Sequence, residues 1–134
     1  MIEIQGLDHI VLRTSRMDEM LHFYSTILGC PIERELSPEF GLVQLRAGSA
    51  LIDLVAVDSE LGRAGGGPPA KTGNNMDHFC LQLKPRPEQE ISDYLASQGI
   101  EAGPFERRYG AQGFGNSIYL RDPEGNTVEL RNRI

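Results

Sequence analysis

Cysteine is scarce in this chain of 134 residues, which contains only Cys30 and Cys80. Disulfide frameworks and zinc ribbons need closely spaced or paired cysteines, so the sequence indicates neither class. Neither cysteine stands in an electropositive motif that would activate it. We therefore expect two reduced, mostly buried thiols.

Long apolar runs and an excess of basic residues are also missing. No run approaches the ~20 residues that cross a bilayer. Residues 1–5 lack the basic start and apolar centre of a signal peptide, which predicts a cytoplasmic protein. The net charge is −6, whereas phosphate binding needs a basic surface. We therefore expect neither a nucleic-acid nor a membrane partner.

Hydrophobic residues make up 40% of the chain, enough for the core of one compact domain or of two small modules. In the first half, residues 8–14 alternate like a strand, and residues 17–28 follow the i, i+3, i+4, i+7 rule of an amphipathic helix. Ser15 is the expected N-cap, and Gly29 the expected end. Further strands are predicted at residues 31–36, 41–46 and 50–57.

The second half repeats this order of elements. A strand is predicted at residues 77–83, a helix at 87–98, and further strands at 100–105, 116–121 and 127–131. The predicted fold class is therefore α+β, with two βαβββ modules related by pseudo-twofold symmetry and forming cupped mixed sheets. The modules span residues 1–57 and 76–134. Residues 58–75, rich in glycine and proline, join them as a linker that could double as a lid.

One short segment recurs in the two halves. Residues 7–12 read Leu-Asp-His-Ile-Val-Leu, and residues 76–81 read Met-Asp-His-Phe-Cys-Leu. Each histidine, His9 or His78, has a carboxylate counterpart, Asp53 or Glu129, on the last strand of its own half. Asp53 lies in an otherwise apolar run, where an unpaired carboxylate is costly, so it needs a cation or hydrogen-bond partners.

Two imidazoles and two carboxylates form a donor set that suits a divalent Zn, Ni, Mn, Co or Fe(II) ion. Such a site leaves open positions for substrate and supports proton transfer by a carboxylate. The alternative interpretation is that the histidines are ordinary, satisfied side chains and that Glu129 is on a solvated face. The spacing alone leaves both interpretations open.

Several motifs resemble those of the vicinal oxygen chelate superfamily, which contains glyoxalase I, fosfomycin-resistance thiol transferases, extradiol dioxygenases and bleomycin-resistance proteins. The two histidine segments match, as do Phe-Tyr-x-x-x-Leu-Gly at residues 23–29 and Asp-Pro-x-Gly-x-x-x-Glu at residues 122–129. The resemblance covers nearly the whole chain apart from the linker. It implies paired βαβββ modules and a homodimer with the site at or near the interface, although some relatives build the site within one chain. The metal ligands that it implies are His9, Asp53, His78 and Glu129, with Glu129 or Asp53 as the catalytic proton carrier.

The chain also departs from these relatives. Glyoxalase I generally carries Glu where Asp53 stands, so the shorter side chain could leave three protein ligands. Fosfomycin-resistance relatives use two histidines and one glutamate, which His9, His78 and Glu129 could supply.

Substrate-binding residues can also be carried over by resemblance. Arg13 resembles a glutathione-carboxylate contact of glyoxalase I; alternatively it pairs with a nearby carboxylate. Ser117 and Tyr119 resemble phosphonate-contacting positions of the fosfomycin enzymes, although Tyr119 equally fits ordinary sheet packing. Arg107 and Arg108, expected beside a glycine-broken loop, are the only local basic candidates.

Three functions follow from the resemblance. The first is a glyoxalase-like, divalent-metal-dependent enzyme, a lyase, isomerase or thiol transferase, acting on a small oxygenated substrate that chelates the ion. The second is a metal-free protein that sequesters a drug or metabolite, as bleomycin-resistance proteins do. The third is an extradiol-type dioxygenase. The sequence does not name the substrate, because one fold hosts several chemistries.

Overall fold

A computed structural model describes residues 1–132 and divides the chain into two compact units, Met1–Ala70 and Lys71 onward. Each unit is built on one four-stranded mixed sheet. No helix among these residues has both the length and the apolar character needed to cross a membrane.

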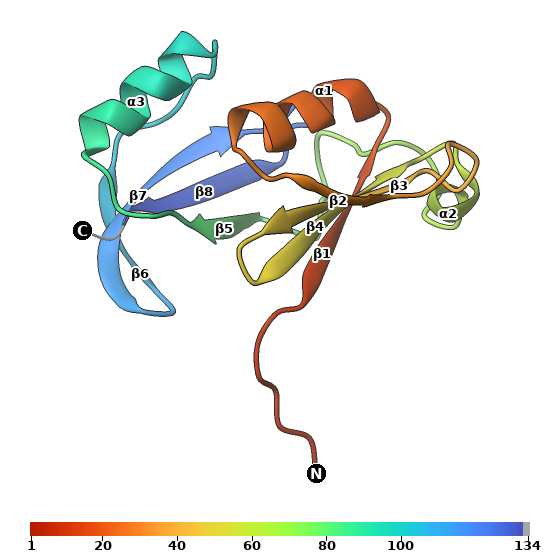
Figure 1. The fold of residues 1–134 in the computed structure, drawn as a ribbon, viewed down its shortest axis with the longest axis horizontal. Helices are drawn as coiled ribbons and strands as arrows, with labels where there is room; N and C mark the ends of the chain where they lie inside the picture. The colour runs from red at the N-terminus through yellow and green to blue at the C-terminus, as the bar shows by residue number, and fades with distance from the viewer. Residues whose placement is uncertain (133–134) are drawn as a thin grey trace. The chain divides into compact units, whose positions relative to one another are not determined.

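The first unit contains β1 (His9–Thr14), β2 (Ile32–Glu35), β3 (Leu42–Ala47) and β4 (Ala50–Ala56) in the spatial order β1-β4-β3-β2 (Figure 1). β1 runs parallel to β4, and the remaining pairs are antiparallel. Between β1 and β2 the chain forms α1 (Met17–Leu21) and a π-helical segment, His22–Ile27. Burial alternates along β1: Leu12 is buried, whereas His9 and Val11 are exposed.

The second unit repeats this plan with β5 (His78–Gln82), α3 (Glu88–Ser97), β6 (Glu106–Gly110), β7 (Gly113–Arg121) and β8 (Thr127–Asn132). Its sheet order is β5-β8-β7-β6, and β5 is parallel to β8. Both units therefore read strand, helix, then three strands. The predicted α+β fold of two βαβββ modules is confirmed.

The first predicted helix differs in detail. Its buried residues Met20, Phe23, Tyr24 and Ile27 keep the predicted spacing, but its second half widens into a π-helix whose Leu28 N–H donates to the Phe23 carbonyl. Ser15 is not the N-cap. Arg16 holds that position without a side-chain cap, and the Thr14 hydroxyl accepts the Arg16 N–H instead.

Two other predictions were incomplete or wrong. Residues 100–105 do not form a strand; they contribute only an isolated bridge between Ala102 and Leu120. Pro104 lacks an N–H for a ladder, and the strand begins after it, at Glu106. The linker contains a short helix that was not predicted, α2 (Glu60–Arg63), capped by the Ser59 hydroxyl, which accepts the Gly62 N–H.

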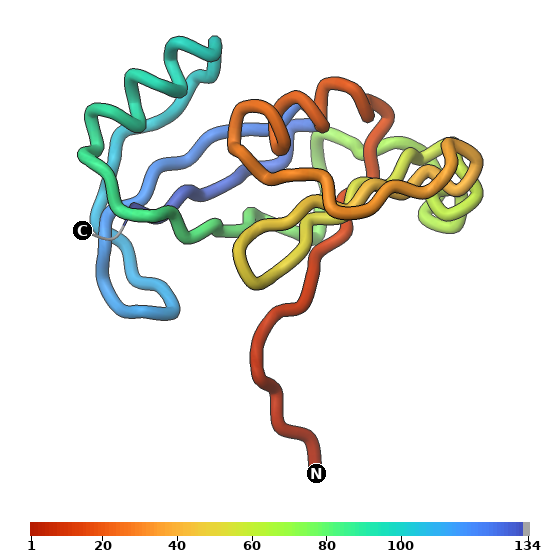
Figure 2. The backbone as a smooth tube through the Cα atoms, viewed as in Figure 1, coloured from red at the N-terminus to blue at the C-terminus, as the bar shows by residue number. Residues whose placement is uncertain are grey.

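The first residues of the chain extend away from the sheet of their unit (Figure 2). Ile2, Ile4 and Leu7 are almost fully exposed there. This arm leads directly into β1, so the first site histidine stands where the chain enters its sheet.

Candidate functional site

Strand register places the two histidines equivalently in their units. In the first unit Asp53 of β4 lies opposite Val11, two residues after His9. In the second unit Glu129 of β8 lies opposite Cys80, two residues after His78. Since directly opposed residues share a sheet face, each histidine lies diagonal to the carboxylate of its own unit.

His78 and Glu129 are in direct contact. The His78 Nε2 lies 3.0 Å from Glu129 Oε1. The carboxylate side chain is only 8% exposed, while 31% of the imidazole is exposed. The pair therefore combines a buried carboxylate with a partly accessible ring.

Glu129 is held in its charged form by its neighbours. Burial, the largest influence, would raise its pKa. Hydrogen bonds from Ser117 and Cys80, with the charge and hydrogen bond of His78, outweigh burial and lower the pKa below its ordinary value. Glu129 is therefore a carboxylate at neutral pH.

Ser117 links this carboxylate to an arginine. Its hydroxyl bonds to Glu129, and it receives a hydrogen bond of 3.0 Å from Arg108 Nη1. Arg108 also donates to Glu106 at 3.0 Å. The serine is fully buried and is thus placed to hold Glu129.

Tyr119 lies over the same face. Its ring centroid is 5.2 Å from that of His78 in an edge-on arrangement, and the Arg108 guanidinium lies 4.2 Å from its ring centroid. Burial and the Glu129 charge raise the pKa of the phenol. Tyr119 therefore remains protonated at neutral pH and can donate a hydrogen bond.

Cys80, beside Glu129, is not an activated thiol. Although the residue as a whole is exposed, partial desolvation of its thiol and the carboxylate of Glu129 raise the pKa of Cys80 to about 11. The structure finds Cys80 exposed and only Cys30 buried, so the expectation of mostly buried thiols holds for Cys30 alone. Burial raises the pKa of Cys30 as well.

Asp53 is the counterpart of Glu129 but is engaged differently. Its residue is 4% exposed. Oδ2 accepts a hydrogen bond of 3.2 Å from Gln44 Nε2 on β3, while Oδ1 is buried without a hydrogen-bond partner. An unpaired buried carboxylate oxygen is costly in a folded protein unless a cation or donor reaches it.

His9 lies on the exposed side of its unit. The hydrogen bond with Asp8 raises its pKa against the opposing effect of burial, and the charge of Asp53 adds to the rise. Asp8 Oδ2 is 2.6 Å from His9 Nδ1. In the second unit Asp77 Oδ2 lies at the same distance from His78 Nδ1.

Two observations indicate that these donors suit a divalent cation. Asp53 Oδ1 is an orphaned buried oxygen, and His78 Nε2 and Glu129 Oε1 face each other across 3.0 Å. The gap therefore brings a nitrogen and an oxygen donor together, a combination that suits a divalent cation. Within residues 1–132, however, no three histidine, cysteine, aspartate or glutamate side chains are grouped closely enough to hold a metal ion.

Arg13 contacts carbonyls rather than a carboxylate. Its guanidinium donates to the backbone oxygens of Gly62, Gly66 and Gly67. The side chain thus ties β1 to the glycine-rich segment after α2. To bind a substrate carboxylate, the Arg13 guanidinium has to give up some of its hydrogen bonds to these glycine carbonyls.

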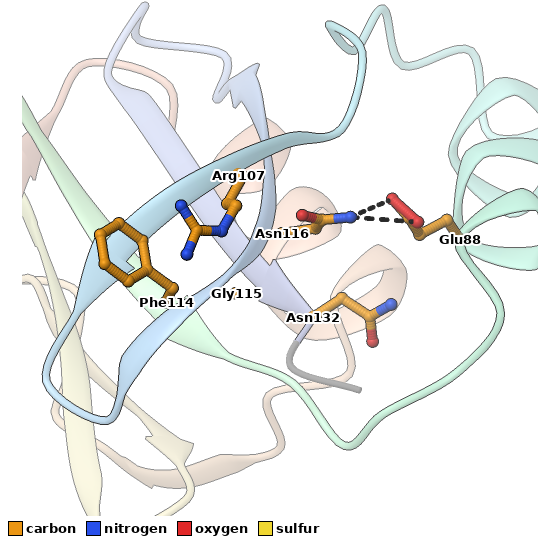
Figure 3. Close-up of a pocket in the computed structure, with 6 residues that line it drawn as sticks. All are labelled: Glu88, Arg107, Phe114, Gly115, Asn116 and Asn132. Atoms are coloured by element: carbon orange, nitrogen blue, oxygen red, sulfur yellow. Dashed lines mark hydrogen bonds between the residues drawn. The ribbon is translucent and has the colours of Figure 1, made fainter.

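The second unit contains a hollow near the site and a cavity away from it. The hollow, about 640 Å³, is lined by residues 99–103 and by Tyr119, Arg121 and Thr127 among others. The cavity, about 160 Å³, contains Arg107, Phe114 and Asn116 (Figure 3). Because side chains alternate along a strand, Asn116 is on the opposite face from Ser117.

That alternation separates the two candidate arginines. Both lie on strand β6 rather than beside a loop. The Arg107 guanidinium stacks on Phe114, 3.8 Å from the ring centroid, whereas Arg108 stacks on Tyr119. Arg108 is therefore the one on the site face.

Sequence reasoning missed several site residues. Gln44, Cys80 and Arg108 were not assigned these contacts, and neither Asp8 nor Asp77 was given a role. Alternation within each strand identifies the side of the sheet, but only the register between strands selects Gln44 as the partner of Asp53. The repeated Asp-His pair was the one signal in the sequence that could have identified Asp8 and Asp77.

Comparison with known proteins matches the chain to one family model and to a relative of known structure. The model of the Glyoxalase/Bleomycin resistance protein/Dioxygenase superfamily matches residues 6–130. The virulence protein STM3117 of Salmonella typhimurium is 30% identical over 128 residues, covering 95% of this chain and 83% of the relative. Its crystal structure superposes with a TM-score of 0.76 and 25% identity, over 99% of this chain and 100% of that one.

Two further crystal structures share the fold at lower identity. A lactoylglutathione lyase from Agrobacterium tumefaciens has a TM-score of 0.68 and 22% identity, covering 96% of this chain and 94% of that one. The fosfomycin resistance protein FosX from Listeria monocytogenes has a TM-score of 0.69 and 22% identity, covering 98% and 96%. At this identity the likeness shows a shared fold.

Proposed function

The chain belongs to the Glyoxalase/Bleomycin resistance protein/Dioxygenase superfamily, and from this premise we propose that it is a divalent-metal-dependent enzyme acting on a small, oxygenated, metal-chelating substrate. The contact between His78 and Glu129 carries the proposal. It joins a nitrogen and an oxygen donor at the edge of an accessible face.

The proposed ligands are His78 and Glu129 with His9 and Asp53, the latter two supplied by the same chain or by a second copy. Asp53 contributes its orphaned Oδ1. When bound, the ion supplies Lewis-acid polarisation of a substrate oxygen. Zn, Ni, Mn, Co and Fe(II) all suit this donor set.

The chain's own residues perform the proton transfer in this proposal. Glu129, ionised because its pKa is lowered, accepts a proton, and Asp53 is the alternative acceptor. Tyr119, still protonated because its pKa is raised, donates a hydrogen bond to a substrate oxygen. The hollow of about 640 Å³ is large enough for a small molecule, but of the proposed site residues only Tyr119 lines it.

Arg13, Ser117 and Tyr119 are the proposed substrate-binding side chains, with the fully buried Ser117 acting through Glu129. On β7, Tyr119 lies directly opposite Glu129, and Ser117 lies opposite Arg131. Arg13 would act through the segment that it holds, by exchanging a glycine carbonyl for a substrate anion. Lactoylglutathione lyase and FosX act on different substrates as their names indicate, so the family leaves the substrate of this chain open.

Metal content tests the proposal. Protein purified without chelator is expected to contain a divalent metal, or to regain it when Ni, Zn, Mn, Co or Fe(II) is added. Less than about 0.1 equivalent, unrestored by any of these ions, contradicts the proposal. Ligand-induced stabilisation that is unaffected by EDTA would favour the metal-free sequestering protein instead.

A further inference from the structure

In both units the residue before the site histidine is an aspartate bonded to its ring. Asp8 Oδ2 lies 2.6 Å from His9 Nδ1, and Asp77 Oδ2 lies 2.6 Å from His78 Nδ1. The same atoms therefore meet at the same distance on two separate strands, β1 and β5. The repetition makes a chance contact a poor explanation.

This contact determines where the ring carries its proton. A carboxylate can only accept, so the Nδ1 beside it has to donate. A neutral imidazole has one N–H, and if Nδ1 holds it, the Nε2 lone pair is left free to bind a cation. In His78, Nε2 also lies 3.0 Å from a carboxylate oxygen, Glu129 Oε1. Without a metal this ring therefore has an acceptor at each nitrogen, so His9 is the ring on which the tautomer can be tested.

We propose that Asp8 and Asp77 are positioning residues that accept from Nδ1 of His9 and His78 and present Nε2 to the metal, and that Asp8 holds His9 in the Nδ1–H tautomer. The inference rests on the proposed function for its metal, but not for its tautomer. Carboxylate–histidine–metal arrangements of this kind tune ligand orientation and basicity.

Within residues 1–132, the two aspartate side chains make no other hydrogen bond or ion pair. Their side chains are 90% and 95% exposed. Replacing either one therefore leaves the core intact, and effects on the histidines can be separated from unfolding. Asp58, an exposed aspartate outside the site, provides a matched control.

The chain also contains its own reference ring. His22 is the third histidine; it follows Leu21 in the sequence and is exposed in the π-helical segment. It has no preceding aspartate to select a tautomer. We expect His22 to show the Nε2–H form that an unconstrained imidazole favours.

Nitrogen NMR of the metal-free protein at pH 9 tests the tautomer directly. His9 is expected to carry the proton on Nδ1, unlike His22, and Asp8→Ala is expected to shift His9 toward Nε2–H. An Nε2–H form of His9 in the wild type overturns the proposal. So does a His9 tautomer that Asp8→Ala leaves unchanged.

Zinc affinity, measured by competition with a chromophoric chelator, tests the consequence. Asp8→Ala and Asp77→Ala are expected to weaken binding roughly tenfold, as loss of an outer partner does, and Asp58→Ala by less than about twofold. Unchanged affinity in the first two variants overturns the positioning role while leaving the proposed function standing. If the wild type binds no metal, the proposed function fails, and the NMR result still decides the tautomer.

Discussion

Glu129 illustrates how one carboxylate can remain charged although it is largely buried. Three neighbours, Ser117, His78 and Cys80, offset the cost of desolvation. Its counterpart Asp53 is one methylene shorter, and only one of its oxygens has a hydrogen-bond partner. Equivalent positions in the two units are therefore stabilised unequally: Glu129 has several partners, whereas Asp53 Oδ1 has none among the described residues.

The lowered pKa of Glu129 predicts a pH-dependent stability. A folded-state pKa below the ordinary 4.5 gives stabilisation that is present above about pH 4.5 and lost as the pH falls through the folded pKa. We expect the difference in unfolding free energy between wild type and Glu129→Gln to shrink over that acidic range. Urea unfolding between pH 7 and pH 3 measures it. A difference that grows toward low pH contradicts the assignment.

The raised pKa of Cys80 predicts that its thiol is alkylated slowly. With a pKa of about 11, roughly one molecule in a thousand is thiolate at pH 8, so alkylation should be on the order of 100-fold slower than for free cysteine. Iodoacetamide labelling read by peptide mass spectrometry measures Cys80 and Cys30 separately. Glu129→Gln should accelerate the alkylation of Cys80, because the charge of Glu129 contributes to the raised pKa of the thiol. Rapid labelling of the wild type would contradict this account.

Among the helices, α2 is the one that sequence patterns did not predict. A Cβ on Gly62 would lie 1.8 Å from the Ala56 carbonyl oxygen, whereas a Cβ on Gly67 would meet nothing within 4 Å. Glycine at position 62 therefore allows α2 to pack closely against the end of β4. The predicted linker is partly structured for this reason.

The two glycines give a matched test of that packing. Gly62→Ala is expected to lower the unfolding free energy by about 1–3 kcal/mol, because backbone has to move. Gly67→Ala is expected to stay within about 0.5 kcal/mol of wild type. Urea unfolding with unchanged m-values checks both. Equal effects of the two substitutions would rule out close packing of α2.

Sequence periodicity predicted most strands and both long helices because their residues alternate or recur as the pleat and the helix require. It failed where another force decides the structure. Residues 106–110 read Glu-Arg-Arg-Tyr-Gly, so β6 shows no alternation of apolar and polar residues. Its pairing with β7 is accompanied by stacking of the Arg107 and Tyr109 side chains on Phe114 of β7. Likewise the histidines and carboxylates could be predicted from their repeat. Their hydrogen-bond partners could not, because register depends on tertiary pairing.

At the scale of the whole molecule, the superfamily match covers residues 6–130, both modules together. Each unit contributes one histidine and one carboxylate to the proposed ligand set. We propose that the protein forms a homodimer in which ligands from two copies complete each site. Symmetric homodimers are the commonest soluble oligomers.

Mixing two inactive variants tests whether copies share a site. Chains carrying His9→Ala and chains carrying Glu129→Gln are each expected to lose tight metal binding. If sites are shared, random re-association should restore about a quarter of the sites, because half of the dimers then hold one intact site. Equilibrium dialysis of the refolded mixture measures this. A dimer that recovers none builds its sites within single chains.

Calorimetric titration of the metal-free protein with Zn²⁺ tests the central claim, that His78 and Glu129 belong to a metal site. The wild type is expected to bind one ion per chain. Glu129→Gln should bind at least about 100-fold more weakly, beyond the typical cost of losing an outer partner, whereas Glu35→Gln, at an exposed position on β2, should bind like wild type. Wild-type-like binding by Glu129→Gln, or binding by none of the three proteins, would contradict the account.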